Sequence, residues 1–179
     1  MVCGVRGADR TLGHLGLGGD RLHQHQGTPL GGRRKRGAFA QGLGISRGGR
    51  TSKVHGLTDE EGRPRVLLIS PGHTNDMTMA PALIAAARGR FTALIADRGY
   101  DSNAIRTAVQ AQGAEVVIPS TRSRTTPLPY NRATYRACNL VERLWCRLKD
   151  WRRVATRYDK LARNYMAGVY LAAIITYWC

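Results

Sequence analysis

Along residues 51–179, hydrophobic and polar positions follow two alternating patterns. Short apolar or alternating runs bounded by glycine, proline or aspartate predict strands. These runs are residues 52–58, 65–70, 91–96 and 114–119. Segments with a helical period predict helices between and after them, at residues 77–87, 103–112, 139–153 and 161–178. This order predicts an α/β fold, in which a mixed sheet is flanked by helices on both faces.

The helix predicted at residues 139–153 combines an apolar stripe with a cationic surface. Its apolar side chains recur at helical spacing and predict a buried face: Leu144, Leu148 and Trp151. Glu142 and Lys149 are about two turns apart, so they project from nearly the same side. Two interpretations of Glu142 are open. It is either an ordinary salt-bridging acid or a carboxylate that holds a cation beside bound phosphate.

Residues 1–50 differ from the rest of the chain, because they are rich in glycine and follow neither pattern. The basic cluster at residues 33–36 indicates a Gly- and Arg-rich arm that lies on phosphates. This arm is expected to be either poorly ordered or the remains of a first strand. We therefore divide the chain into the arm and a domain at residues 51–179. His23 and His25 would share one face of a strand, but no third ligand is nearby, so no metal site is predicted there.

Charge and composition narrow the class of partner. The chain has 28 Lys and Arg against 12 Asp and Glu, a formal net charge of +16. This excess predicts a polyanionic partner, most often nucleic acid. Residues 1–10 lack the apolar core of a signal peptide, and the apolar run at residues 165–179 is short for a membrane span. The four cysteines show no regular spacing and are expected to be reduced thiols in a cytoplasmic protein, with no membrane partner.

Asp97 is the strongest candidate for chemistry. It ends an apolar strand and is followed at once by Arg98 and Gly99. Ligands of open α/β sheets collect at the carboxyl ends of strands, although an acid there also serves as a helix cap. A strand-end carboxylate and a helix-face carboxylate such as Glu142 can share hard divalent cations, which prefer oxygen ligands. Two such metals can activate a water or a 3′-hydroxyl at a phosphodiester.

Two segments resemble a known family. Residues 96–106, Ala-Asp-Arg-Gly-Tyr-Asp-Ser-Asn-Ala-Ile-Arg, and residues 139–143, Asn-Leu-Val-Glu-Arg, are similar to signature segments of bacterial insertion-sequence transposases of the DDE class, in the IS-five-like group. Residues 153–164 match as well, and the resemblance runs from about residue 44 to the end. It implies an RNase H-like fold in which three acids hold two Mg²⁺ or Mn²⁺ ions. Those metals drive nicking and strand transfer at the ends of a mobile element.

The resemblance also implies roles for individual residues. Asp97 matches the second acid of the family and Glu142 the third. Tyr135 and Lys149 match a tyrosine and a lysine around the glutamate, where the lysine is expected to contact DNA phosphate. Neighbouring cationic side chains are expected to bind DNA too: Arg143, Arg147 and Arg153.

Two departures from the family pattern affect these expectations. The family places an arginine three residues after the tyrosine, whereas this chain has Cys138, which loses a fork-shaped phosphate ligand. The first acid is harder to place. Asp20 is the nearest candidate for this catalytic and metal-binding position, in a region interrupted by glycines. Asp59 and Asp76 are expected in a hairpin turn and at a helix cap, and so are not expected to replace it.

The expected function is therefore DNA transposition on double-stranded DNA at element terminal inverted repeats, in the cytoplasm at the nucleoid. Activity as an enzyme depends on the first acid. The late start of the chain predicts a truncated or frameshifted product, with a second copy or an upstream-frame portion as protein partner. Two alternatives stay open. One is an inactive remnant that only binds DNA, and the other is a structural or ribosome-associated basic protein, which explains the charge but not the motifs.

Overall fold

The computed structural model describes residues 11–15, 20–23, 41–46, 49–87 and 91–179, with only the backbone described for 11–15, 20–23 and Ser46. The basic cluster at residues 33–36 and His25 lie outside the described residues. The expected arm-like character of residues 1–50 and the expectation that His23 and His25 form no metal site are therefore not tested.

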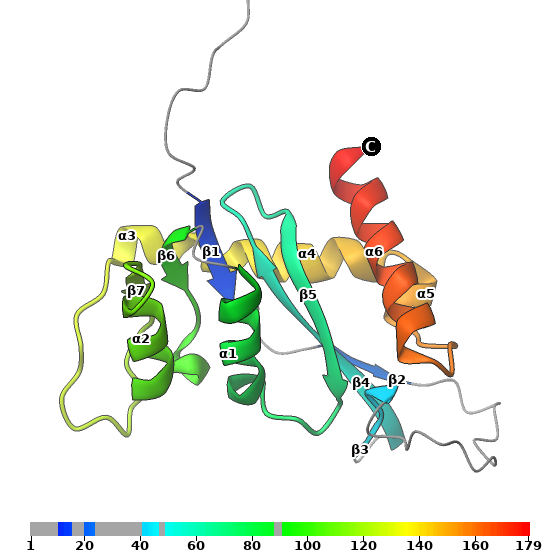
Figure 1. The fold of residues 1–179 in the computed structure, drawn as a ribbon, viewed down its shortest axis with the longest axis horizontal. Coiled ribbons are helices and arrows are strands. Elements are labelled where there is room, and N and C mark those ends of the chain that lie inside the picture. The colour runs from blue at the N-terminus through cyan, green and yellow to red at the C-terminus, as the bar shows by residue number, and fades with distance from the viewer. Residues whose placement is uncertain (1–10, 16–19, 24–40, 47–48, 88–90) are drawn as a thin grey trace, which may run out of the picture.

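Strand β4 (Gly49–Thr58) organises the antiparallel half of one mixed sheet (Figure 1). It pairs along most of its length with β5 (Pro64–Pro71), which forms the expected hairpin. It also pairs antiparallel with β1 (Thr11–Leu15) and β2 (Asp20–His23), and with the short β3 (Gly44–Ser46). Three strands thus fall inside residues 1–50, and the proposed division at residue 50 stays a prediction.

The other half of the sheet is parallel. β6 (Phe91–Ile95) runs parallel to β1, and β7 (Glu115–Val117) runs parallel to β6. The carboxyl ends of β1 and β6 therefore point the same way, with His14 level with Ile95. This geometry places whatever follows β6 at an edge where ligands commonly collect.

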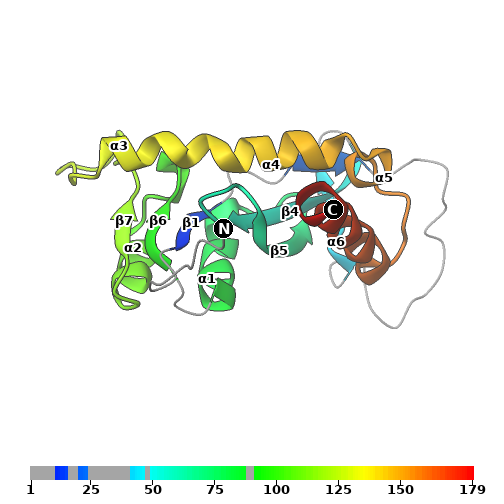
Figure 2. The same cartoon turned by 90° about the horizontal axis from the view of Figure 1, so that it is seen from above.

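Helices cover both faces of the sheet (Figure 2). On one face lie α1 (Asp76–Ala87) and α2 (Asn103–Gln110). Along the other runs a continuous helical rod made of α3 (Arg132–Tyr135), the 3₁₀ turn η3 (Arg136–Cys138) and α4 (Asn139–Lys149). The expected α/β architecture, a mixed sheet flanked by helices on both faces, is confirmed.

The chain ends in α5 (Arg152–Ala155) and the longer α6 (Ala162–Trp178), which packs against α4 and β5. One apolar cluster fills the space between the sheet and the α1–α2 layer, and includes Leu83, Leu94 and Ile105. A second cluster joins the sheet to α4 and α6, and includes Leu144, Leu148 and Val169. The core is thus divided by the sheet into two layers.

The helix predicted at residues 139–153 differs from its prediction at both ends. Asn131 caps a helical run that starts at Arg132, because its side-chain oxygen accepts hydrogen bonds from the next backbone N–H groups. The run ends at Lys149, before Trp151. Trp151 is 39% exposed, so the prediction that it belongs to the buried stripe is wrong. Tyr135 and Cys138 therefore stand on the helical rod itself.

Two predicted helix boundaries are confirmed by their contacts. Ser102 caps α2 by accepting a hydrogen bond from the Ile105 N–H at 3.2 Å. Gly113 follows that helix with φ of +72°, a left-handed conformation that favours glycine and stops the helix. Thus α2 begins and ends close to the predicted residues.

Candidate active site

Asp97 lies directly after β6, with its backbone still extended. Its Oδ1 accepts a hydrogen bond of 2.8 Å from the Gly99 N–H, which caps the short 3₁₀ turn η2 (Arg98–Tyr100). A Cβ on residue 99 would stand 2.9 Å from this oxygen, too close for the carboxylate to keep its position. Gly99 therefore allows the backbone to approach and orient the carboxylate of Asp97. Asp97 thus also acts as a helix cap, which is the alternative role considered from the sequence.

The environment of Asp97 disfavours its charge. Partial burial raises the pKa of Asp97, and the negative charge of Asp76 adds to this effect. The Gly99 N–H and the positive charge of Arg98 lower the pKa, without cancelling the rise. A carboxylate in such a place gains from a nearby cation, which would stabilise its ionised form.

Cys138 is a buried thiol on which both candidate acids act electrostatically. Its side chain packs beside Ile95 at the end of β6, two residues before Asp97. The pKa of the thiol is raised to about 11 by burial, and then by the negative charges of Asp97 and Glu142. The structure thus brings the strand-end acid and the helix acid within electrostatic reach of one buried side chain. At neutral pH that thiol stays protonated, which makes it a poor nucleophile and metal ligand.

Tyr135, Cys138 and Glu142 share one side of the helical rod, since they are spaced by three and four residues. The Tyr135 hydroxyl is hydrogen-bonded to the Cys138 thiol, and its ring packs edge-on against Tyr130 with centroids 5.4 Å apart. The pKa of Tyr135 is raised to about 12, mainly by burial and by the neighbouring thiol and Asp97. The tyrosine is therefore a neutral hydroxyl beside Cys138 and within electrostatic reach of Asp97.

Glu142 is exposed, and within the described residues it forms no ion pair. Both interpretations of Glu142 therefore stay open. Arg143 and Lys149 are also exposed on α4. Their positions leave a carboxylate among cations on an accessible helix surface.

Two of the expected DNA-binding arginines have partners inside the chain. The Arg147 guanidinium lies 5.4 Å from the ring centre of Tyr177 on α6. Arg153, 74% exposed in its side chain, is 3.5 Å from Asp159. An exposed pair at this distance contributes little to stability, so Arg153 stays accessible to another anion.

Asp20, the candidate first acid, lies in β2, and its backbone pairs with Val54. Since β1 pairs with both β4 and β6, Ile95 lies level with Thr58. Asp97 stands two residues beyond Ile95, and Val54 four residues from Thr58. Asp20 is thus offset from the level of Asp97 by about two residues, roughly 7 Å along the sheet. Its side chain is not described, so its role as a ligand stays a prediction.

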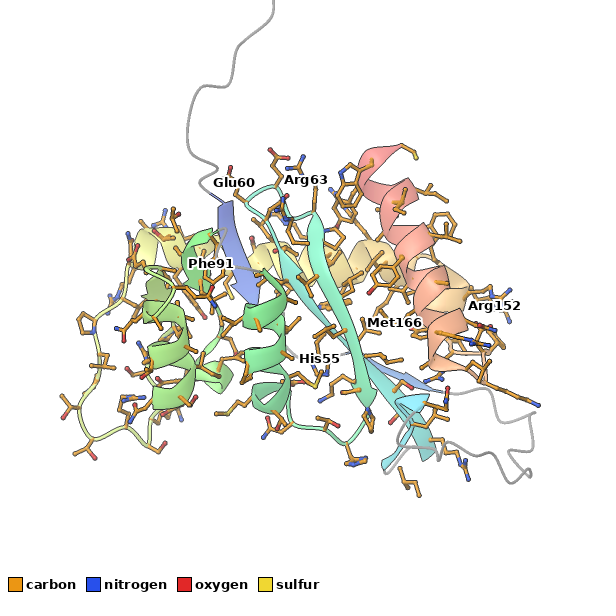
Figure 3. All side chains as sticks on the ribbon, in the orientation of Figure 1. His55, Glu60, Arg63, Phe91, Arg152 and Met166 are labelled. Carbon is orange, nitrogen blue, oxygen red and sulfur yellow. The ribbon has the colours of Figure 1, made fainter. Side chains whose placement is uncertain are left out.

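The structure adds a polar cluster that the sequence reasoning missed. Asp76, at the start of α1, lies 3.0 Å from the Lys53 Nζ and 3.5 Å from the His55 Nδ1, both on β4. Figure 3 labels His55. Ser70 on β5 completes the cluster at 2.7 Å from the His55 Nε2. The alternation of Lys53 and His55 in a buried strand was the available signal. Asp59, in contrast, closes the predicted hairpin turn through the Arg63 N–H and side chain.

Most of the signature segment after Asp97 supports the fold. Tyr100 is buried, and the buried Asp101 accepts hydrogen bonds from Arg106, Arg124 and the Thr121 N–H. Burial opposes the charge of Asp101, but these donors hold its pKa well below the usual range. Asp101 therefore fastens the loop after β7 to α2. In this segment only Asp97 is in electrostatic contact with Cys138.

Among the residues that the structure describes, no group of three or more His, Cys, Asp or Glu side chains is arranged to hold a metal ion. A metal site with Asp97 and Glu142 as two of three ligands therefore stays a prediction. Cys138, Cys146 and Cys179 are free thiols, as expected of them. No helix in the described part of the chain is long and apolar enough to cross a membrane.

The fold and site define an α/β domain with one candidate carboxylate, Asp97, beyond the end of a parallel strand and another, Glu142, on a helix that packs on the sheet. Comparison with known families identifies it further: residues 23–177 match the family model described as Transposase DDE domain, and the chain belongs to this family. The match includes both Asp97 and Glu142. The expected DDE class is confirmed, whereas the IS-five-like group and a truncated or frameshifted origin stay predictions.

The chain is similar to two insertion-sequence proteins. It is 29% identical over 125 residues to a putative transposase for insertion sequence element IS6501 from Brucella ovis, covering 68% of this chain and 94% of that protein. It is 32% identical over 137 residues to a putative transposase for IS402 from Burkholderia cepacia, covering 71% of this chain and 63% of that protein. The match thus spans less than two thirds of the IS402 protein. A solved catalytic core domain of BIV integrase aligns with 94% of this chain and 82% of its own, at 13% identity and a TM-score of 0.47.

Proposed function

We propose that the chain acts in DNA transposition, by metal-dependent cleavage and strand transfer of phosphodiester bonds at the ends of an insertion sequence. One observation carries the proposal: Asp97 and Glu142, from distant parts of the sequence, both act electrostatically on the same buried thiol of Cys138. Perturbed pKa values cluster at functional sites, which makes these two acids the candidates for a shared role. The relatives named above supply the biological context, since both are described as putative transposases.

The residues present fit a divalent cation in part. Asp97 and Glu142 provide the oxygen ligands that Mg²⁺ or Mn²⁺ prefers, and the raised pKa of Asp97 leaves room for a cation to stabilise its charge. When bound, the metal would supply activation of the attacking oxygen and stabilisation of the leaving one. Asp20 is the proposed third ligand. The catalytic proposal depends on it, because two carboxylates alone form an incomplete set.

Double-stranded DNA is the proposed substrate, at the terminal inverted repeats of the element. Tyr135 would present its neutral hydroxyl beside the acids, and the exposed cations on the helices would bind phosphates: Arg143, Arg147, Lys149 and Arg153. These cations bind the polyanion without regard to sequence, so they position the DNA while the acids act. A cytoplasmic, nucleoid-associated location follows from this proposal.

The rival function is DNA binding without cleavage. Cys138 favours it, because an uncharged thiol stands where the family pattern has an arginine. The two-residue offset of Asp20 from the level of Asp97 favours it too. Such a remnant would keep the basic surface of the helices and lose the chemistry. Metal binding separates the two functions, because the remnant has no need of it.

The decisive experiment is calorimetric titration of the full chain with Mn²⁺. Binding should be lost in Asp97→Asn and weakened at least several-fold in Gly99→Ala, since the added methyl group displaces the Asp97 carboxylate. The matched control is Gly168→Ala, whose Cβ would meet nothing within 4 Å and should leave binding unchanged. Equal binding in all four proteins would contradict the assignment of Asp97. No binding in any of them would favour the DNA-binding remnant.

A nicking assay on supercoiled DNA with Mg²⁺ then tests the chemistry with the same proteins. Asp97→Asn and Glu142→Gln should abolish nicking while DNA binding, measured by fluorescence anisotropy, stays within about two-fold, because neither substitution removes a cation. Asp20→Asn should also abolish nicking if Asp20 completes the set. Full nicking activity of Asp20→Asn would exclude Asp20 as a ligand. It would not contradict the roles of Asp97 and Glu142.

A further inference from the structure

Strand β1 carries a histidine, His14, at a position close to the candidate acids. In the sheet, β1 lies between β6 and β4. The backbone of His14 is level with Ile95 on β6 and with Thr58 on β4. Asp97 follows Ile95 by two residues, with its backbone still extended, so it lies roughly 7 Å further along a strand that is about 4.8 Å away. The Cα atoms of His14 and Asp97 are thus roughly 8 Å apart.

The pairing of β1 with β6 places His14 on the face of the sheet that the helical rod covers. Successive residues of a strand alternate between its two faces. On β6, Ile95 packs with Cys138 of the rod, whereas Leu94 belongs to the apolar cluster on the α1–α2 side. Because residues that are level on adjacent strands share a face, His14 lies on the rod side with Ile95.

The pairing of β1 with β4 leads to the same face. Gly56 lies against the ring of Trp145 on α4, so Thr58, two residues further along β4, shares the rod side. His14 is level with Thr58. Two separate strand pairings therefore agree on the face that position 14 occupies.

The helical rod carries Glu142 across the same strand. The rod lies on β6 at Cys138 and on β4 at Trp145, and β1 is the strand between these two. Helix α4 accordingly contacts β1. The part of the rod that passes over β1 includes Glu142. The fold thus brings His14, Asp97 and Glu142 from three elements to one region of the sheet.

Thr58 supplies an independent observation. Its hydroxyl group is buried, and among the described residues it has no hydrogen-bond partner. A histidine that binds a metal through one ring nitrogen usually donates the N–H of the other to a nearby acceptor, which fixes the orientation of the ring. The hydroxyl oxygen of Thr58 can serve as this acceptor, since Thr58 is level with His14 and on the same face.

We propose that His14 is a nitrogen ligand of the cation held by Asp97 and Glu142, with Thr58 as the acceptor that orients its ring. This inference rests on the proposed function, because it needs both acids to hold the cation. It leaves room for Asp20, since an octahedral ion takes more ligands than these three. Imidazole suits transition metals better than it suits Mg²⁺, so this site would favour an ion such as Co²⁺.

Pulsed electron paramagnetic resonance of Mn²⁺ bound to the full chain tests the ligand directly. The bound ion should show coupling to a nitrogen nucleus, and isotopically labelled histidine should change that coupling in the wild type itself. His14→Gln should abolish the coupling. His23→Gln is the matched control and should keep it. His23 is level with Thr51, which is an odd number of residues from Gly56 and so lies on the opposite face of the sheet.

Calorimetric titration tests the consequences for affinity. His14→Asp keeps an oxygen ligand, so it should retain Mn²⁺ binding and reduce the preference for Co²⁺ over Mg²⁺ by about tenfold or more. Thr58→Val removes the acceptor at nearly constant volume and should weaken Mn²⁺ binding by about tenfold. Circular dichroism checks that each variant is folded, and the nitrogen coupling of His14→Asp replaces that of His14→Gln if the latter unfolds.

The outcomes distinguish this inference from the proposed function. Mn²⁺ binding that depends on Asp97 but shows no coupling to histidine nitrogen would overturn the inference and leave the proposed function in place. Coupling that persists in His14→Gln, or an unchanged metal preference in His14→Asp, would have the same meaning. Unchanged affinity in Thr58→Val would contradict the role of Thr58. A wild type that binds no Mn²⁺ would contradict both the inference and the proposed function.

Discussion

His55 is a buried histidine whose surroundings oppose its positive charge. It is fully buried on β4, with its Nε2 paired to Ser70. Its pKa is lowered to about 4 by burial first and by Lys53, while the negative charge of Asp76 acts in the opposite direction. At neutral pH His55 is therefore neutral and helps to join β4, β5 and the start of α1.

This burial predicts a pH dependence of stability. In the unfolded chain His55 regains its ordinary pKa of 6.5, so between about pH 4 and pH 6.5 the unfolded state binds more protons than the folded one. The free energy of unfolding should thus fall as the pH drops through this window, by about 3 kcal/mol in all. Urea unfolding at a series of pH values measures it.

The variant His55→Gln should lose this contribution to the slope, and His73→Gln, at an exposed histidine, should keep it. Identical slopes in the wild type and His55→Gln would show that the histidine is accessible to protons in the folded protein.

Helix α4 can approach the sheet closely because residue 56 of β4 is a glycine. Trp145 lies across Gly56 of β4, and a Cβ at residue 56 would stand 3.0 Å from the Trp145 Cζ2 and 3.2 Å from its Cη2. Trp145 is almost fully buried, so it has little room to move away. Because Glu142 is one turn from Trp145 on the same helix, this contact also helps to set the position of the acid.

We predict that Gly56→Ala lowers the free energy of unfolding by about 1–3 kcal/mol, because the added methyl group forces α4 away from the sheet. Adding Trp145→Phe removes the second ring and should make the double variant more stable than the sum of the two single effects predicts. Urea unfolding of the four proteins closes the cycle. Strictly additive effects would mean that residue 56 does not press on Trp145.

The periodicity of apolar residues was sufficient to predict the regular elements but not the residues at which they begin and end. The strands of the hairpin and the helices α1, α2 and α6 each carry a clear apolar pattern, and each was predicted close to its observed bounds. The helical start at Arg132 was missed, because residues 120–134 have no apolar period and the start depends on the cap of Asn131. Trp151 follows the helical spacing by coincidence, since the helix ends before it.

The candidate site was predictable in its residue types and not in its packing. Asp97 and Glu142 were identified by their positions after a strand and on a helix. That both acids act electrostatically on Cys138 depends on how α4 crosses the sheet, which no local pattern encodes. The same holds for Asp76, expected as a helix cap, which also pairs with Lys53 on β4.

At the scale of the whole molecule, the buried side chain of Arg157 connects separate parts of the chain near the C-terminal helices. Arg157 is fully buried between α5 and α6, although burial lowers the pKa of its guanidinium. It stacks 5.4 Å from the ring centre of Tyr165, and its donors reach four acceptors: the carbonyls of Gln41, Asp159 and Lys160 and the hydroxyl of Ser52. Residue 41, strand β4 and the start of α6 thus share one side chain.

Replacing the Arg157 guanidinium should destabilise residue 41, strand β4 and the start of α6 together. In Arg157→Lys a single ammonium group cannot serve four separated acceptors, so we expect a loss of about 3 kcal/mol in the free energy of unfolding. Arg152→Lys, at an exposed arginine (Figure 3), should change it by less than about 0.5 kcal/mol. Urea unfolding gives the two values. Hydrogen exchange should show faster opening in β4 and α6 alike, because both depend on the same side chain. Faster exchange confined to residues 157–161 would mean that Arg157 orders only the turn before α6 and does not connect it to the sheet.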